Sequence, residues 1–164
     1  MSDIKNLVRE NIRGFAPYAS ARDTFEIGEN SNLVLLDANE NPFVDNFVED
    51  ENSKNNLNQI TLNRYPDPKQ KLLRAKISRE FGVDFEQVIC GNGSDELIDL
   101  LVRIFCEPKQ DSILVCPITF GVYKVCAGVQ DVAVENVELI EEQDDFQLDV
   151  EKIIKSEAKI CFIP

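Results

Sequence analysis

The sequence of 164 residues contains no histidine and no tryptophan, and it has a single methionine. Without histidine, the chain cannot build a Ser-His-Asp or Cys-His catalytic site, and it lacks a common zinc ligand. Hydrolases that use these catalytic sites and the commonest zinc sites are therefore excluded. Chemistry carried by this chain must come from carboxylates, lysine, tyrosine or a bound cofactor.

Basic residues and long apolar runs are also scarce. Lysine and arginine number 17 against 30 aspartates and glutamates, which gives a formal net charge of -13. Nucleic acids and anionic membranes attract basic surfaces, so we expect neither as a partner. No apolar run is long enough to span a bilayer, and the N-terminus has no signal-peptide core. The expected location is cytoplasmic.

The cysteines do not form a metal or redox motif. Their number, five, is odd, and no two have CxxC spacing. Most lie in apolar segments, which favours reduced, buried thiols in a cytosolic protein. A catalytic cysteine is the weaker alternative, because no histidine is present to activate it. The cysteines are at positions 90, 106, 116, 126 and 161.

Short apolar segments alternate with segments of helical periodicity, which favours an α/β fold with a mainly parallel sheet. The helix after the glycine turn is expected to bury Leu97, Leu100, Leu101, Ile104 and Phe105. Gly82 is expected to cap the helix before it. The expected strands are 33–36, 87–90, 112–116, 130–137 and 159–163. The expected helices are 69–81, 119–128, 149–156 and the one after the glycine turn, which holds Leu97 to Phe105 and is closed off by Pro108.

The expected organisation has three parts. Residues 1–32 form an N-terminal arm; 33–68 hold a strand, an acidic loop and a turn; and 69–164 form the first part of the main α/β domain. The strand at 159–163 is of the buried, central type, yet no helix follows to cover it. We therefore expect a truncated chain.

The turn from Gly91 to Glu96 is the most informative segment. Its two glycines let the backbone turn sharply and leave amide N–H groups uncovered. The helix that follows adds unpaired N–H donors and partial positive charge at its first turn. We therefore expect a phosphorylated cofactor or substrate to bind here.

Two nucleotide motifs are excluded at this turn, and one structural alternative stays open. Glu96 occupies the position of the third glycine of the dinucleotide fingerprint, and no Gly-Lys-Ser/Thr follows. In the alternative, Asn92 or Ser94 caps an ordinary helix, and Asp95 and Glu96 complement its dipole. The spacing alone supports both interpretations about equally.

Five blocks, in this order and spacing, together resemble the histidinol-phosphate aminotransferases, a branch of the fold-type I pyridoxal-phosphate (PLP) enzymes. They are Pro17-Tyr18-x-Ser20-Ala21-Arg22, Leu36-Asp37-Ala38-Asn39-Glu40-Asn41-Pro42, Arg64-Tyr65-Pro66-Asp67-Pro68, the segment from Gly91 to Pro108, and Pro117-x-Thr119-Phe120-x-x-Tyr123. By length, the chain resembles about the N-terminal half of that family.

The resemblance implies a large α/β domain that holds PLP, a smaller domain built from both chain ends, and a homodimer with sites at its interface. It implies amino transfer between glutamate and imidazole-acetol phosphate in L-histidine biosynthesis. The Schiff-base lysine, the aspartate that pairs with the pyridine nitrogen and the substrate-binding arginines have no counterparts here. No catalytic residue is therefore expected in this chain, and the segment alone is expected to be inactive.

The resemblance also assigns cofactor contacts. Ser94 and the backbone N–H of Asp95 would hold the PLP phosphate, with Gly93 keeping the approach open. Phe120 stands where the family usually has a tyrosine stacked on the pyridine ring, and phenylalanine keeps the stacking face. The alternative for Phe120 is a core aromatic, and Tyr123 is expected to be structural.

The remaining assignments lie earlier in the chain. Tyr65 is similar to the tyrosine that reaches across the dimer to the neighbouring subunit's cofactor phosphate, where a phenol is a neutral donor. Its alternative is a tyrosine packed in a proline-rich turn. Tyr18 would lie on the substrate side of the pocket, Asn39 and Glu40 in the segment that closes over the substrate, and Arg22 in a structural ion pair.

Two alternatives for the function stay open. The blocks mostly bind PLP, so another enzyme of the same branch would also fit, such as a threonine-phosphate decarboxylase or an aromatic aminotransferase. A non-catalytic binding or interaction domain would also fit, because the lysine that normally bonds PLP is absent.

Overall fold

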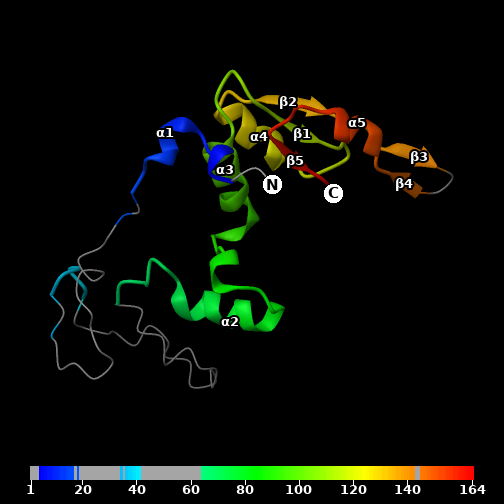
Figure 1. The fold of residues 1–164 in the computed structure, drawn as a ribbon. Coiled ribbons are helices and arrows are strands. Elements are labelled where there is room, and N and C mark those ends of the chain that lie inside the picture. Colours follow the sequence, from blue (N-terminus) through cyan, green and yellow to red (C-terminus); the bar gives the residue numbers. More distant parts are fainter. Residues whose placement is uncertain (1–3, 17, 19–33, 35, 42–63, 143–144) are drawn as a thin grey trace. The chain divides into compact units, whose positions relative to one another are not determined.

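The structure is a computed structural model, and it describes residues 4–16, 18, 34, 36–41, 64–142 and 145–164. The chain divides into two compact units (Figure 1). One unit combines Met1–Ala16 with Cys90–Pro164, and the other is Pro17–Ile89. The three parts expected from the sequence, 1–32, 33–68 and 69–164, stay predictions.

The first unit is built on a parallel sheet of three strands, in the order β2 (Ala133–Asn136), β1 (Ser112–Val115) and β5 (Ile160–Phe162). In the centre, Ile113 pairs with Val134 on one side and with Ile160 on the other. A strand covered on both faces reads as an unbroken apolar run, as β1 does. The expected α/β architecture with a parallel sheet is confirmed.

Helices cover both faces of this sheet, because successive strand side chains point to opposite sides. Ile113 and Val115 pack with residues of α3 (Gly93–Phe105) and α4 (Val122–Val129). Leu114 packs in a second cluster that includes Ile153 of α5 (Val150–Lys155). The unit therefore has three layers, with α3 and α4 on one face and α5 on the other (Figure 1).

The buried stripe of α3 differs from the expected one. Ile98 and Val102 are buried one helical turn apart, whereas Leu100 and Leu101 are exposed. The run of apolar residues from 97 to 105 supports two overlapping helical stripes, and periodicity alone does not choose between them. Packing against α4 and β1 selects the stripe centred on Ile98 and Val102.

The first unit also contains short elements that the sequence did not predict in this form. The N-terminal residues form a 3-10 turn, η1 (Ile4–Asn6), and one helical turn, α1 (Glu10–Arg13). An antiparallel hairpin, β3 (Ile140–Glu142) with β4 (Asp145–Gln147), precedes α5.

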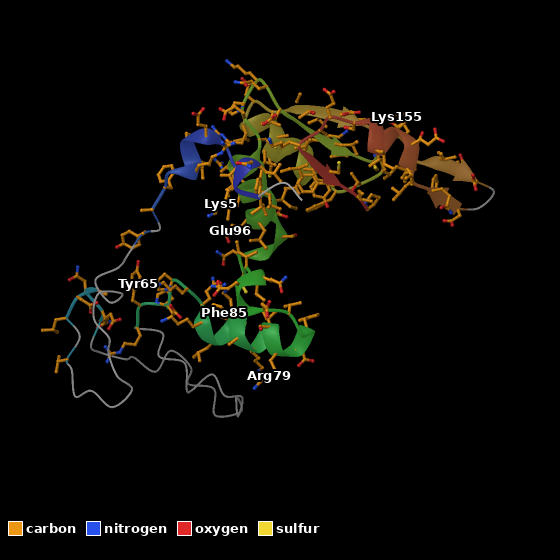
Figure 2. The ribbon with its side chains drawn as sticks, in the orientation of Figure 1. Lys5, Tyr65, Arg79, Phe85, Glu96 and Lys155 are labelled. Carbon is orange, nitrogen blue, oxygen red and sulfur yellow. The ribbon has the colours of Figure 1, made fainter. Side chains whose placement is uncertain are left out.

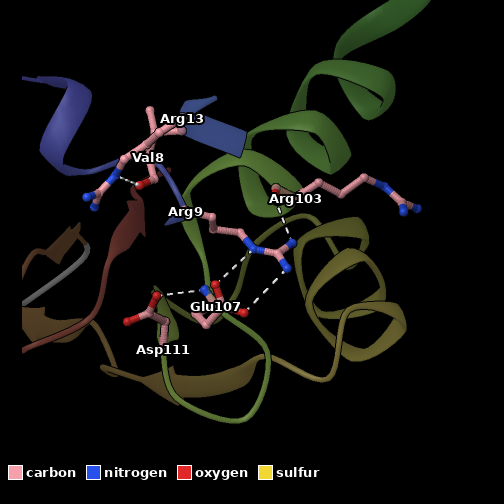
Figure 3. A network of polar contacts seen from close by, with 6 residues as sticks. All are labelled: Val8, Arg9, Arg13, Arg103, Glu107 and Asp111. Atoms are coloured by element: carbon pink, nitrogen blue, oxygen red, sulfur yellow. Dashed lines mark hydrogen bonds and ion pairs between the residues drawn. The ribbon is translucent and has the colours of Figure 1, made fainter. Parts of the chain in front are cut away.

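Arg9 fixes the N-terminal residues to the end of α3. Its backbone N–H donates to the carbonyl of Ile104 at 3.0 Å, and its guanidinium donates to the carbonyl of Arg103 at 3.0 Å. The guanidinium also pairs with Glu107 at 3.2 Å, and the N–H of Glu107 donates to Asp111 at 2.7 Å (Figure 3). This network joins α3 to the start of β1.

The second unit is described mainly by α2 (Lys71–Phe81) and η4 (Phe85–Gln87). The helix ends at Gly82, whose φ of +64° is left-handed and whose N–H donates to the carbonyl of Ser78, so the expected glycine cap is confirmed. At the other end, the carboxylate of Asp67 accepts the N–H groups of Lys69 and Lys71, both at 2.9 Å.

The strand expected at 87–90 is wrong. Gln87 belongs to η4, and residues 88–90 pair with no strand among the described residues. The carbonyl of Val88 instead accepts the Arg74 side chain at 2.7 Å, and the same guanidinium lies 4.0 Å from the centre of the Phe85 ring. Of the strand expected at 33–36, only Val34 and Leu36 are described; the rest lies outside the described residues.

The cysteines are all free thiols, and three of them, Cys106, Cys116 and Cys126, are buried. Burial raises the pKa of the Cys106 thiol to about 11, so it stays protonated at neutral pH. Cys161 is exposed. No helix within the described part of the chain has both the length and the apolar character needed to cross a bilayer.

Candidate cofactor-binding site

The turn into α3 has the backbone geometry of an anion cradle. Gly93 has a φ of +76°, a left-handed value that glycine adopts without strain. A Cβ placed on Gly93 would meet nothing within 4 Å, so the space in front of the turn is open. Asn92 is the N-cap residue, yet no side-chain hydrogen bond caps the helix. The alternative in which Asn92 or Ser94 simply caps α3 is therefore not supported.

The first turn of α3 also presents free donors. Within the described part of the chain, the backbone N–H groups of Ser94 and Asp95 donate to no acceptor. The helix is 13 residues long, so its N-terminus carries partial positive charge. Unpaired N–H groups, positive potential and open space are the requirements for binding a phosphate.

Glu96 folds back toward the N-terminal end of α3. Its carboxylate accepts the backbone N–H of Asn92, the residue that directly precedes the helix. Gly91 makes this possible, because a Cβ there would lie 2.8 Å from Oε2 of Glu96 and 2.9 Å from Cδ2 of Leu97. Glu96, which occupies the position of the third glycine of the dinucleotide fingerprint, thus closes the loop. The sequence did not indicate this role.

Aromatic residues flank the start of α4. Phe120 is 52% exposed, and its ring meets Tyr123 edge-on with centroids 5.9 Å apart. Tyr123 packs against the main core, in keeping with its expected structural role. Helices α3 and α4 are in contact, and burial together with the carboxylates of Asp99 and Asp95 raises the pKa of Cys126.

The other expected site residues belong to the second unit. Tyr65, labelled in Figure 2, has a side chain drawn beside the start of α2. It is 62% exposed, and its backbone N–H donates to Oε1 of Glu40 at 2.7 Å. Asn39, next to Glu40, has a left-handed φ of +49°. Glu40 therefore brings the segment of Asn39 next to Tyr65. Tyr18 is exposed, and Arg22 lies outside the described residues.

The structure thus groups the expected site residues in two sets. Gly93, Ser94 and Asp95 form one helical turn in the first unit, and Asn39 and Tyr65 meet through Glu40 in the second. The sequence could not indicate the contact of Glu40, since its partners lie 24 and 25 residues away and follow no periodic pattern.

Comparison with known proteins gives a family match over most of the chain. The family model described as aminotransferase class I and II matches residues 31–163. The histidinol-phosphate aminotransferase of Flavobacterium johnsoniae is 42% identical over 164 residues, which cover 98% of this chain and 42% of the relative. That of Parabacteroides distasonis is also 42% identical, over 99% of this chain and 42% of the relative. The chain therefore spans about two fifths of the length of these relatives.

Similar solved structures cover a smaller part of the chain. A putative aminotransferase from Burkholderia pseudomallei has a TM-score of 0.48 and 19% identity, over 62% of this chain and 30% of its own. A PLP-bound C-S lyase from Staphylococcus hominis has a TM-score of 0.47 and 17% identity, over 61% of this chain and 27% of its own.

Proposed function

The chain belongs to the class I and II aminotransferases, and from this premise we propose that its complete gene product is a histidinol-phosphate aminotransferase. The reaction would move an amino group between glutamate and imidazole-acetol phosphate in L-histidine biosynthesis. Relatives of this name, 40–42% identical over nearly the whole chain, support the proposal. The activity is assigned to the complete gene product because the matched relatives are more than twice as long.

We further propose that the first turn of α3 holds the phosphate of PLP. The observation that carries this is the pair of N–H donors on Ser94 and Asp95, which have no acceptor in the described part of the chain, next to Gly93, where a Cβ would meet nothing within 4 Å. The Ser94 hydroxyl would add a third donor. The residues present therefore fit a phosphate group, and the carboxylate of Glu96 is engaged by the N–H of Asn92.

PLP, when bound, supplies an electron sink for the negative charge that develops at Cα of an amino acid. The contribution of this chain is to bind and orient the cofactor. Ser94 and Asp95 would fix the phosphate end, and the exposed ring of Phe120 would offer a stacking face to the pyridine. No catalytic residue is assigned to these 164 residues.

Residues of the second unit would supply further contacts to cofactor and substrate. Tyr65 would donate its phenol to the cofactor phosphate of the neighbouring subunit in a homodimer, and its exposed side chain is available for such a contact. Tyr18 and Asn39 would lie on the substrate side. We place the enzyme in the cytoplasm, where the substrates of amino-acid biosynthesis are found.

The complete gene product, purified and loaded with PLP, tests this function. It should convert histidinol phosphate and 2-oxoglutarate to imidazole-acetol phosphate and glutamate. Its kcat/KM should be higher with histidinol phosphate than with phenylalanine or tyrosine. Preference for the aromatic amino acids, or decarboxylation of threonine phosphate without amino transfer, would assign the protein to another enzyme of the same branch.

A further inference from the structure

The carboxylate of Glu40 joins two segments of the second unit. Its Oε2 lies 2.7 Å from Nη1 of Arg64, and its Oε1 accepts the backbone N–H of Tyr65, also at 2.7 Å. The side chain of Glu40 is only 8% exposed, whereas that of Arg64 is 55% exposed. A nearly buried carboxylate thus holds two consecutive residues that lie 24 and 25 positions further along the chain.

These contacts are specific to a carboxylate. Both oxygens accept, and bonds to a guanidinium or a backbone N–H are stronger when the acceptor is charged. A glutamine could accept the N–H of Tyr65, but its amide NH₂ would then face the guanidinium of Arg64, donor against donor. A buried charge is also costly unless it is paired, so Glu40 and its partners are held together.

The backbone of Tyr65 is fixed from both sides. Glu40 holds its N–H, and Pro66 follows, which has a fixed φ and restricts Tyr65 to extended conformations. The side chain of Tyr65 stays 62% exposed, and its hydroxyl has no hydrogen-bond partner among the described residues. A rigid backbone with an uncommitted phenol is the arrangement expected of a side chain that binds a ligand.

We propose that Glu40 is a positioning residue: by holding Arg64 and Tyr65 it directs the Tyr65 phenol toward the cofactor phosphate. This inference rests on the proposed function. Because Asn39 precedes Glu40 directly and turns the backbone with its left-handed φ, the same carboxylate links the substrate-side segment to the phosphate-side tyrosine.

The test is a double-mutant cycle on the complete gene product, read by the dissociation constant of PLP for the apoenzyme. The variants are Glu40→Gln, Tyr65→Phe and both together. Each single variant should weaken PLP binding about tenfold, which corresponds to about 1.4 kcal/mol, one phosphate hydrogen bond. The double variant should bind no more weakly than Tyr65→Phe alone, because Glu40 acts through that phenol. Glu86→Gln is the matched control, since Glu86 is 87% exposed in the same unit, and it should bind PLP like the wild type.

The outcomes separate this inference from the proposed function. Losses that multiply in the double variant would show a general structural effect and overturn the inference, as would a Glu40→Gln or Tyr65→Phe variant with unchanged affinity. If Glu40→Gln does not fold, Glu40→Asp takes its place in the cycle, because aspartate keeps the charge but is one methylene too short to hold both partners. A wild-type enzyme that binds no PLP would contradict the proposed function itself.

Discussion

The ring of Tyr123 lies stacked on that of Phe162, with centroids 4.4 Å apart and planes inclined by 13°, and this contact ties α4 to β5. The same tyrosine meets Phe120 edge-on, at an interplanar angle of 89°. The exposed Phe120 ring is therefore oriented by an aromatic contact that is anchored in the sheet. A ring that is already held in place loses less conformational entropy when a flat ligand stacks on it.

Removal of the Tyr123 ring should destabilise the first unit. Tyr123→Ala deletes both aromatic contacts and leaves a cavity beside the core, so we expect the free energy of unfolding to fall by about 2–3 kcal/mol. Tyr123→Phe keeps the ring and should change it by less than about 0.5 kcal/mol. Urea unfolding of the complete gene product measures both. Equal losses in the two variants would mean that the hydroxyl, not the stacking, carries the stability.

The proposed phosphate contacts of α3 involve one side chain, Ser94, and backbone N–H groups, and two substitutions should distinguish them. Ser94→Ala removes one hydroxyl donor to a charged group, so the dissociation constant of PLP should rise by about 10- to 100-fold. Asp95→Asn keeps the backbone N–H and removes a negative charge, so it should bind PLP at least as tightly as the wild type. Fluorescence titration of the apoenzymes gives both values. Weaker binding by Asp95→Asn would assign a role to the carboxylate instead of the N–H.

A side chain at position 91 should lower the free energy of unfolding as long as the carboxylate of Glu96 bonds the N–H of Asn92. In Gly91→Ala the new Cβ would displace the carboxylate of Glu96 from the N–H of Asn92, at a cost of about 1 kcal/mol for the lost hydrogen bond. In a Glu96→Ala background the same substitution should cost less, because that clash is absent. Chemical denaturation of the four proteins gives the coupling. Identical costs in both backgrounds would place the strain at Leu97 instead.

Acid should weaken the N-terminal end of α2. The backbone N–H of Lys71 lowers the pKa of Asp67 most, burial raises it, and the N–H of Lys69 lowers it further, so that the net shift is downward. Because the folded-state pKa lies below the unfolded value of about 4, the stabilisation is present above pH 4 and is lost as the pH falls through the folded-state pKa.

Asp67→Asn should therefore unfold with a shallower pH dependence below about pH 4 than the wild type. Glu80→Gln, on the exposed side of the same helix, serves as the matched control. Denaturant midpoints at several acidic pH values measure the slope. A variant that keeps the wild-type slope would show that Asp67 does not cap the helix.

Local features of the sequence predicted most of the first unit. The strand β1 follows from an apolar run between Asp111 and Pro117, and the alternation with helices predicted the parallel sheet. The apolar run at 88–90 has the same character, yet it forms no strand, because a strand also needs a neighbour and the carbonyl of Val88 bonds Arg74 instead. The β3–β4 hairpin was not predicted, because its strands contain polar residues such as Glu141 and Glu142.

In the candidate site, too, local features could be predicted from the sequence and tertiary contacts could not. The turn at Gly93 and the donors of Ser94 lie within one helical turn, so the sequence alone could indicate this turn as a phosphate site, which stays a prediction. The closure by Glu96 is also local, but the sequence indicated a dipole partner and not a hydrogen bond to Asn92. The contact of Glu40 with Arg64 depends on the tertiary fold, and no pattern in the chain encodes it.

The pairing of Arg9 with Glu107 has a consequence for folding kinetics. The two residues are 98 positions apart, so their contact closes a long loop and carries a large entropic cost, whereas β1, α4 and β2 are neighbours along the chain. Contacts of high sequence separation form slowly. The β1–α4–β2 nucleus should therefore assemble early, and residues 4–16 should dock onto the end of α3 only in a late step.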